Sequence, residues 1–308
     1  MGVAVVGIGY FGSLHAQAYA RLPECELIAV VDPDPATAPL AEWLGVPRLD
    51  HVDELPDSVQ TVSVATPVGT HYKLTKRLLQ RGLDVLLEKP IAETPRQAKE
   101  LCRLAARHRR VLQIGHIERF NPAFALGPSL LPRARTIDMV RTTQRPPRGD
   151  WLNVVMDLMI HDLDLILFGV TSHVVRFHAT GGSLGMTAID SACVELHFGN
   201  GCVARLTSHW GATVAINDRR MFAELDTGET WAMDFLRREA YRTRSAASYT
   251  QDLPMPPLGI PADTLSLQLA SFVRASQQRA TPHVTPEHGY AALDLARKIQ
   301  ERILGQAS

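Results

Sequence analysis

The stretch Val3-Ala-Val-Val-Gly7-Ile-Gly9-Tyr-Phe-Gly12 decides the fold. Its apolar beginning predicts a short buried strand, and a helix is expected directly after it, over 13–22. In such a strand–turn–helix, the first glycine permits a tight turn and the second lets backbone N–H groups approach a pyrophosphate. The third lets the helix lie close to the strand. The stretch therefore predicts a dinucleotide-binding turn, with cofactor contacts from Gly7, Gly9, Tyr10, Phe11 and Gly12.

An acidic residue lies where the same motif needs one. Asp32 follows the apolar run 27–31, at the carboxyl end of the next expected strand. A carboxylate there accepts hydrogen bonds from the adenine ribose and repels a 2′-phosphate. Asp34 adds a second negative charge, and the next basic residue is Arg48. We therefore expect NAD rather than NADP; the alternative is a glycine turn that binds nothing.

Apolar strands and helices alternate through the first part of the chain. Strands are expected at 3–6, 27–31, 61–65, 85–87 and 111–115, and helices at 13–22, 36–44, 71–80 and 95–108. Continuous apolar strands that alternate with helices indicate a parallel sheet covered on both faces. Residues 1–118 are therefore expected to form an α/β Rossmann domain with a doubly wound sheet.

The pattern changes in residues 119–308. Strands are expected at 134–143, 174–179, 191–198, 203–210, 219–225 and 230–235, and helices at 153–168, 264–280 and 286–303. Consecutive strands with short turns favour antiparallel pairing. This part is therefore expected to be an α+β domain with an open, mostly antiparallel sheet that binds substrate. One face of such a sheet needs a cover, so a homodimer or homotetramer is expected.

The overall composition excludes several classes of protein. The 308 residues carry 32 basic and 32 acidic side chains, which is not the footprint of a general nucleic-acid binder. No apolar run is long enough to span a bilayer, and the first residues form no positively charged leader. The four cysteines form no CxxC pair, and no cluster of metal ligands is evident. We expect a cytoplasmic protein without a metal, a nucleic-acid partner or a membrane partner.

Two further motifs carry chemistry. Glu88-Lys89-Pro90 ends an expected strand, where its lysine is either a solvated cation or a catalytic donor, and the bond to Pro90 could be cis. On the apolar helix 153–168, Asp157 and His161 stand four residues apart and share a face. They form part of an active site or a satisfied core pair, or Asp157 stabilises the N-terminal turn of the helix.

Taken together, the glycine turn with Asp32, the Ala65-Thr66-Pro67 segment, Glu88-Lys89-Pro90 and Asp157-x-x-x-His161 resemble the glucose–fructose oxidoreductase/inositol dehydrogenase/MocA family. The resemblance extends over about residues 2–305. It implies that Lys89 and His161 flank the substrate carbinol, with Asp157 completing the set, and that the Lys89–Pro90 bond is cis. It also implies cofactor contacts from Thr66 and Pro67. From their positions at the strand ends, His71, Glu88 and Lys89 are expected to contact the cofactor as well.

The mechanism expected from this resemblance is oxidation of a secondary alcohol. A histidine ordinarily has a pKa of about 6.5, so a neutral imidazole is available to act as general base at pH 7. His161 is assigned that role. Asp157 would fix the imidazole tautomer or hold Lys89, and Lys89 would stabilise the alkoxide.

The segment after residue 115 limits the range of expected substrates. Where sugar and inositol dehydrogenases often carry two arginines, this chain has Glu118-Arg119 within His116-Ile-Glu-Arg-Phe-Asn-Pro122. This form is similar to family members that oxidise nucleotide sugars. The implied substrate is UDP-N-acetylglucosamine, oxidised at its 3-hydroxyl on a route to a diamino sugar of lipid A.

The resemblance and the basic loop 141–148 together give the expected substrate contacts. Arginine suits a diphosphate, although a solvated loop is equally compatible with this composition. The expected contacts are Lys89, Arg119, Asn121, Arg145, Arg148, Asn153 and His161. Two alternatives stay open: an inositol or simple sugar dehydrogenase, and an NAD-sensing regulatory protein of the same fold.

Overall fold

The computed structural model describes residues 1–144, 153–183, 189–211, 217–243 and 264–306. The chain divides into two compact units. Unit 1 comprises Met1–Ile117 and Ala262–Tyr290, and unit 2 comprises Glu118–Pro261 and Ala291–Ser308. The sequence prediction had placed all of 119–308 in one second domain. The structure differs, because the segment 262–290 belongs to the unit that contains the glycine turn.

Unit 1 contains a six-stranded parallel sheet with the order β3-β2-β1-β4-β5-β6. Its strands are β1 (Gly2–Val6), β2 (Glu26–Val31), β3 (Arg48–Leu49), β4 (Val59–Val64), β5 (Asp84–Leu87) and β6 (Leu112–Ile114). The strand order reverses direction between β1 and β4. Ligands of such sheets bind outside the carboxyl ends of the strands at that reversal. The topology therefore locates a site at the ends of β1 and β4.

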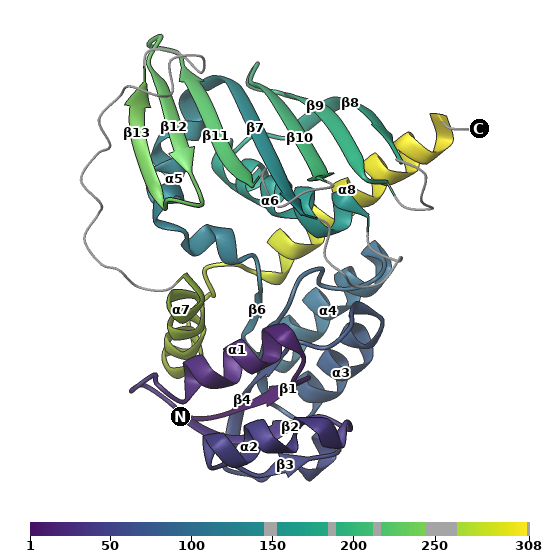
Figure 1. Ribbon diagram of the computed structural model, residues 1–308, viewed down its shortest axis with the longest axis vertical. Helices are drawn as coiled ribbons and strands as arrows, with labels where there is room; N and C mark the ends of the chain where they lie inside the picture. Colours follow the sequence, from purple (N-terminus) through teal and green to yellow (C-terminus); the bar gives the residue numbers. More distant parts are fainter. Residues whose placement is uncertain (145–152, 184–188, 212–216, 244–263, 307–308) are drawn as a thin grey trace. The chain divides into compact units, whose positions relative to one another are not determined.

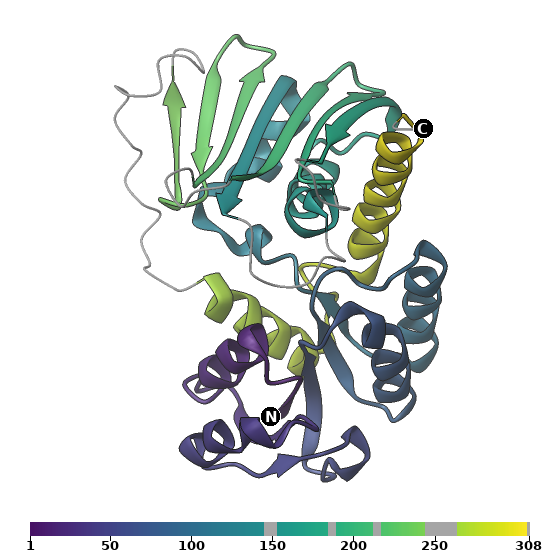
Figure 2. The same cartoon turned by 45° about the vertical axis from the view of Figure 1, so that its right-hand side comes forward.

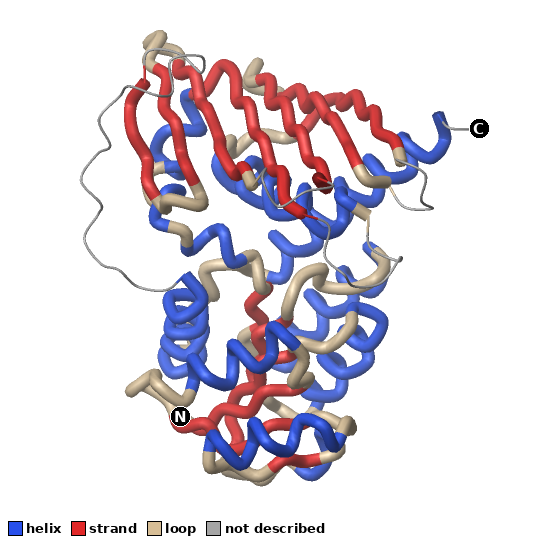
Figure 3. The backbone as a smooth tube through the Cα atoms, in the orientation of Figure 1, coloured by secondary structure: helices blue, strands red, loops and turns tan. Residues whose placement is uncertain are grey.

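Helices cover both faces of this sheet. They are α1 (Tyr10–Tyr19), α2 (Ala38–Leu44), α3 (Val68–Gln80), α4 (Pro95–His108) and α7 (Thr264–Gln278). In Figures 1 and 3, α1, α2 and α7 lie on one side of the strands and α3 and α4 on the other. Local sequence fixes where α4 begins, because Thr94 accepts the N–H of Gln97 and the Gln97 side chain accepts the N–H of Thr94.

Helix α7 joins unit 1 through its apolar side. Leu269, Phe272 and Val273 are fully buried in a cluster that also contains Val3 and Tyr19. Burial of a large apolar side chain stabilises a fold by about 1.5–3 kcal/mol. The packing of these side chains explains why a segment so late in the sequence belongs to the first unit.

Unit 2 contains a seven-stranded sheet with the order β13-β12-β11-β7-β10-β9-β8. Its strands are β7 (Ala134–Gln144), β8 (Val174–Gly182), β9 (Ser191–Phe198), β10 (Val203–Gly211), β11 (Asp218–Leu225), β12 (Thr230–Asp234) and β13 (Glu239–Thr243). Neighbouring strands are antiparallel except β7 and β10, which are parallel. A parallel pair needs a crossover connection, and the chain between β7 and β10 includes a helix and two strands.

Helices cover one face of this sheet. They are α5 (Gly127–Leu130), α6 (Ile160–Gly169) and the later part of α8 (Pro286–Gln306). Figure 2 shows no helix on the other face among the described residues. As far as the described residues show, the sheet is open on one side, in agreement with the expected open, mostly antiparallel architecture. Whether a second copy covers that side stays a prediction.

Local differences from the expected elements are few. The strands β3 and β13 were not foreseen, because β3 has two residues and β13 is largely polar. The helix expected at 153–168 begins as a π-helical segment, Val155–Met159, and continues as α6. Single-turn π segments in helices are frequent at functional sites.

Candidate functional site

The glycine turn has the geometry of a phosphate-binding loop. Gly7 has a φ of +85°, and a Cβ on Gly12 would lie only 1.7 Å from the carbonyl oxygen of Gly7. A Cβ on Gly9 would meet nothing within 4 Å. Gly9 is also the N-cap of α1, so the free N–H groups and the positive dipole end of that helix lie at this open position, and its first turn contains no acidic residue. The turn therefore fits the pyrophosphate of a dinucleotide.

Asp32 is held at the end of β2 by the turn itself. Its Oδ2 accepts the N–H of Ile8 at 2.6 Å, and its Oδ1 accepts the N–H of Asp34 at 2.9 Å. A carboxylate offers about four acceptor positions, so positions remain for two ribose hydroxyls. The residues of this end of the sheet therefore fit NAD.

Sequence reasoning missed the cation beside Asp32. Arg48 donates from Nη1 to the Asp32 carbonyl, and the same guanidinium pairs with Asp50 at 2.7 Å. Arg48 is brought there by β3, which pairs with β2. The arginine was visible in the sequence, but its position depends on this short strand.

Lys89 lies directly after β5, at the carboxyl edge of the sheet. It is half-buried, and its bond to Pro90 is cis, as the family resemblance implied. Thr66 and Pro67 follow β4, which pairs with β5. The structure thus brings the predicted motifs Thr66-Pro67 and Glu88-Lys89-Pro90 to neighbouring strand ends within unit 1.

The carboxylate of Glu88 is ionised in a largely buried position. Its side chain is 15% exposed, and its Oε1 lies 3.3 Å from Nε2 of His15. Burial would raise the pKa of Glu88, but the hydrogen bond and charge of His15, together with Lys89, hold that pKa below its ordinary value. A negative charge is therefore fixed beside the catalytic candidate Lys89.

His71 does not present its ring nitrogens to a ligand. The side chain is buried, Nδ1 lies 2.8 Å from the Pro90 carbonyl oxygen, and Nε2 lies 2.8 Å from the Thr66 carbonyl oxygen. Its predicted role as a cofactor contact stays a prediction, which these two contacts disfavour. These contacts hold the His71 ring against the loops that follow β4 and β5.

In unit 2, Asp157 and His161 are the half-exposed polar residues of an otherwise mostly buried helical segment. Asp157 lies in the π-helical turn, and His161 lies in the first turn of α6. Asn153 begins this segment, because its Oδ1 accepts the N–H groups of Val155 and Met156. Asn153 is therefore a helix cap here, and its predicted substrate contact stays a prediction.

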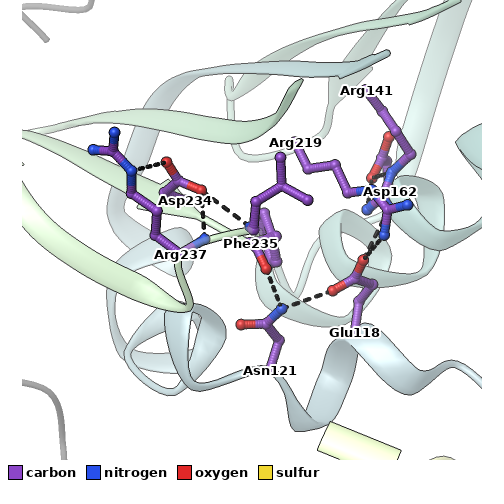
Figure 4. Close-up of polar contacts among 9 residues, drawn as sticks. Glu118, Asn121, Arg141, Asp162, Arg219, Asp234, Phe235 and Arg237 are labelled. Carbon is purple, nitrogen blue, oxygen red and sulfur yellow. Dashed lines mark hydrogen bonds and ion pairs between the residues drawn. The ribbon is translucent and has the colours of Figure 1, made fainter. Parts of the chain in front are cut away.

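Arg119 and Asn121 make internal contacts. Arg119 donates from Nε and Nη2 to both carboxylate oxygens of Asp164, with both side chains 1% exposed, and its guanidinium lies 3.6 Å from the ring centre of Phe168. Asn121 donates to Glu118 and to the carbonyl of Phe235 (Figure 4). Their predicted substrate contacts are untested, and these internal partners disfavour them.

A buried charge network lies beside α6, and sequence reasoning did not foresee it (Figure 4). Arg141 of β7 donates to Glu118 at 2.9 Å and to Asp162 at 2.8 Å. Arg219 of β11 lies 3.5 Å from Glu118. Burial opposes ionisation of Glu118, but Arg141 and Arg219 hold its pKa below the ordinary value. The sequence signal was the pair Glu118-Arg119, but not the distant partners of the glutamate.

The remaining predictions concern two arginines, metal ligands and membrane-spanning helices. Arg145 and Arg148 lie outside the described residues. Among the residues that the structure describes, no three His, Cys, Asp or Glu side chains group as metal ligands. No helix in that part of the chain combines the length and apolar character needed to cross a membrane.

Comparison with known protein families gives two matches. Residues 1–116 match the family described as "Oxidoreductase family, NAD-binding Rossmann fold". Residues 132–224 match the "GFO/IDH/MocA C-terminal domain". The two matches fall one in each unit and agree with the two sheets described above.

Individual relatives are similar to this chain over much of their length. The chain is 34% identical over 210 residues to UDP-N-acetylglucosamine 3-dehydrogenase of Acidithiobacillus ferrooxidans, a stretch that covers 68% of this chain and 66% of that protein, just under two thirds. A crystal structure of the enzyme with that name from the same organism superposes with a TM-score of 0.90 at 28% identity, covering 99% and 98% of the two chains. Inositol 2-dehydrogenase of Rhizobium meliloti is 26% identical, covering 95% and 93% of the two chains.

Proposed function

This chain belongs to the GFO/IDH/MocA family of NAD-binding oxidoreductases, and from that premise we propose that it oxidises a secondary hydroxyl of a nucleotide sugar. The proposed substrate is UDP-N-acetylglucosamine, and the proposed product is its 3-keto sugar. The observation that carries this choice is the likeness to UDP-N-acetylglucosamine 3-dehydrogenase, in sequence over two thirds of this chain and in fold over nearly all of it.

The proposed chemistry uses three side chains. NAD, when bound, supplies the acceptor for the hydride that leaves the carbinol carbon. His161 takes the hydroxyl proton, Asp157 orients the imidazole or holds Lys89, and the ammonium of Lys89 stabilises the alkoxide. Gly7, Gly9 and Gly12 form the turn that would hold the pyrophosphate, and Asp32 would bind the adenine ribose.

A second candidate is oxidation of an inositol or a simple sugar. The inositol 2-dehydrogenase relative favours it, because that match covers nearly the full length of both chains. The two candidates differ in one chemical requirement, since only a nucleotide sugar needs a site for a diphosphate. We propose that Arg145 and Arg148 supply that site.

The deciding experiment is an NAD reduction assay at 340 nm, a wavelength that reports the reduced nicotinamide. UDP-N-acetylglucosamine, free N-acetylglucosamine and myo-inositol are offered to the same purified protein. Turnover of the UDP-sugar alone is the expected result. Turnover of myo-inositol without the UDP-sugar supports the second candidate, and NAD binding without turnover of any of them supports the regulatory alternative.

The diphosphate contact has its own test. Arg145→Ala and Arg148→Ala should raise the KM for the UDP-sugar more than the KM for NAD, because each guanidinium binds phosphate oxygens. An exposed arginine on another element, Arg103 of α4, gives the matched control. An unchanged KM for both ligands would remove the two arginines from the proposal.

A further inference from the structure

Two buried histidines of unit 1 lie against the turn that carries Lys89, and the proposed chemistry uses neither of them. His15 of α1 and His71 of α3 are each 1% exposed. Burying an imidazole is unfavourable unless its nitrogens find partners. Three of the four ring nitrogens have hydrogen-bond partners, and the fourth, Nε2 of His15, faces the carboxylate of Glu88.

His15 reaches the turn through Glu88. Its Nδ1 lies 2.7 Å from the hydroxyl of Ser63 on β4, and its Nε2 lies 3.3 Å from Oε1 of Glu88. On another side of the same carboxylate, a Cβ on Gly115 would lie 2.6 Å from Oε1, so the backbone of Gly115 packs against it. The Oε2 of Glu88 lies 3.3 Å from the backbone nitrogen of Lys89. The Glu88 carboxylate is therefore confined between His15, Gly115 and the main chain of Lys89.

His71 contacts the main chain of the turn at Pro90, the residue after Lys89. Its Nδ1 lies 2.8 Å from the carbonyl oxygen of Pro90, and its Nε2 lies 2.8 Å from the carbonyl oxygen of Thr66. Both neighbours are acceptors, and a neutral imidazole has only one N–H to donate. Burial lowers the pKa of His71 against the opposing effect of the two carbonyls, Glu88 and Glu93, which favours the neutral ring with a single donor.

We propose that His15 and His71 are positioning residues that together fix the Lys89 turn, His15 through the Glu88 carboxylate and His71 through the Pro90 carbonyl. The inference rests on the proposed function only in taking Lys89 as catalytic. In each ring one nitrogen faces the turn and the other faces the end of β4 or its following loop. For His15 the nitrogen that faces the turn is Nε2, and for His71 it is Nδ1.

This difference between the two rings gives a sharp test. Asparagine places its amide nitrogen where histidine has Nδ1, and glutamine places its amide nitrogen where histidine has Nε2. His15→Gln therefore keeps a donor toward Glu88, whereas His15→Asn keeps only the Ser63 side. The pattern reverses at position 71, where His71→Asn places a donor opposite the Pro90 carbonyl and His71→Gln places one only on the Thr66 side.

The expected kinetic result is a crossed pattern. His15→Gln and His71→Asn should retain kcat within about threefold, whereas His15→Asn and His71→Gln should lose about 10–100-fold, because a displacement of about 1 Å can cost roughly 100-fold in rate. The Kd for NAD should change little in all four. Equal losses for Asn and Gln at each position, or losses that track the size of the side chain, would indicate a packing role only and overturn the proposal.

A second measurement keeps the inference separate from the proposed function. Amide hydrogen exchange of the segment 85–92, followed by mass spectrometry, requires no substrate. Exchange should accelerate in His15→Asn and His71→Gln and stay near the wild-type rate in His15→Gln and His71→Asn. If the wild-type protein oxidises none of the offered compounds, the proposed function fails, but this exchange pattern still decides the positioning role. Identical exchange in the Asn and Gln variants contradicts it.

Discussion

At the scale of single residues, Asp32 has two functions at the end of β2. It stabilises the glycine turn by accepting the N–H of Ile8 and its own loop by accepting the N–H of Asp34, and its remaining acceptor positions would bind the ribose. Arg48 lies next to it but is paired with Asp50. The local charge therefore favours a cofactor without a 2′-phosphate.

Replacement of this carboxylate should weaken the preference for NAD. Asp32→Ala removes the ribose acceptor and the repulsion of a 2′-phosphate, so the KM for NAD should rise about tenfold or more, since hydrogen bonds to charged groups contribute about 1.5–3 kcal/mol. The KM for NADP should change much less. Steady-state kinetics with both cofactors measure this, and Asp57→Ala, at an exposed position before β4, is the control. An unchanged ratio of the two KM values contradicts the assignment.

Loss of a proposed catalytic side chain, Lys89 or His161, should lower kcat without weakening NAD binding. Lys89→Ala and His161→Ala should each lower kcat by about 10²–10⁴-fold, the range typical of a general acid or base. The Kd for NAD should stay within a few-fold of wild type. Lys73→Ala and His178→Ala, at exposed positions, are the matched controls. If a Lys89 or His161 variant keeps near-normal kcat, the role given to that residue is wrong.

At the scale of elements, α6 depends on charges rather than on apolar contacts alone. Asp162 and Asp164 are both 1% exposed, and each pairs with an arginine from another element, Arg141 of β7 or Arg119 of the turn at 117–120. Burial nevertheless raises the pKa of Asp162. These pairs fix the rotation of α6, the helix that carries His161, because a rotated helix would leave buried charges without partners.

Glu118 offers the test of this network. Glu118→Gln should lower the free energy of unfolding by about 3–5 kcal/mol, the range for removing one partner from a buried pair. Asp226→Asn, which breaks the exposed pair with Arg133, should cost about 0–1 kcal/mol. Urea denaturation of both variants gives the comparison. A Glu118→Gln loss no larger than that control would show that the network does not stabilise unit 2.

The stabilising effect of Glu118 should also depend on pH. The folded protein holds the pKa of Glu118 below its ordinary value, so its stabilising effect is complete above an ordinary carboxyl pKa of about 4.3. The effect is lost as the pH falls through the lowered pKa of the folded state. The stability difference between the wild type and Glu118→Gln should therefore be largest near neutral pH and shrink in acid. A difference that grows in acid would reverse the sign of the assigned shift.

At the scale of the whole molecule, the chain passes from unit 1 to unit 2, returns to unit 1 for residues 262–290 and ends in unit 2. Helix α7 completes the apolar layer over α1, although more than 200 residues separate them in sequence. Phe272 is 0% exposed in this layer, together with Val3 and Tyr19. The NAD-binding unit is therefore not finished until the C-terminal part of the chain is made.

Truncation of that side chain should destabilise unit 1. Phe272→Ala should cost about 3–5 kcal/mol, because it leaves a cavity among fully buried residues. Leu304→Ala, at a side chain that is 51% exposed on α8, should change stability by less than about 0.5 kcal/mol. Thermal unfolding with and without NAD measures the loss and shows which transition the cofactor raises. Equal effects of the two substitutions would mean that α7 contributes little to unit 1.

The sequence by itself determined the elements and the motifs of this protein. The glycine turn with Asp32, the Glu88-Lys89-Pro90 turn and nearly all helices and strands follow from local patterns, because apolar periodicity and turn residues act over a few positions. The order of these motifs was specific enough to give the family. The tertiary contacts of these motifs with distant residues were not predicted.

Only the tertiary structure decided which distant residues meet. It brought Arg48 to Asp32 and His15 to Glu88, paired β7 in parallel with β10, and returned α7 to the first unit. Each of these contacts joins segments far apart in the chain, so no local pattern encodes it. They form because buried charges need partners and apolar faces need cover, and many partners satisfy those needs until the whole chain packs.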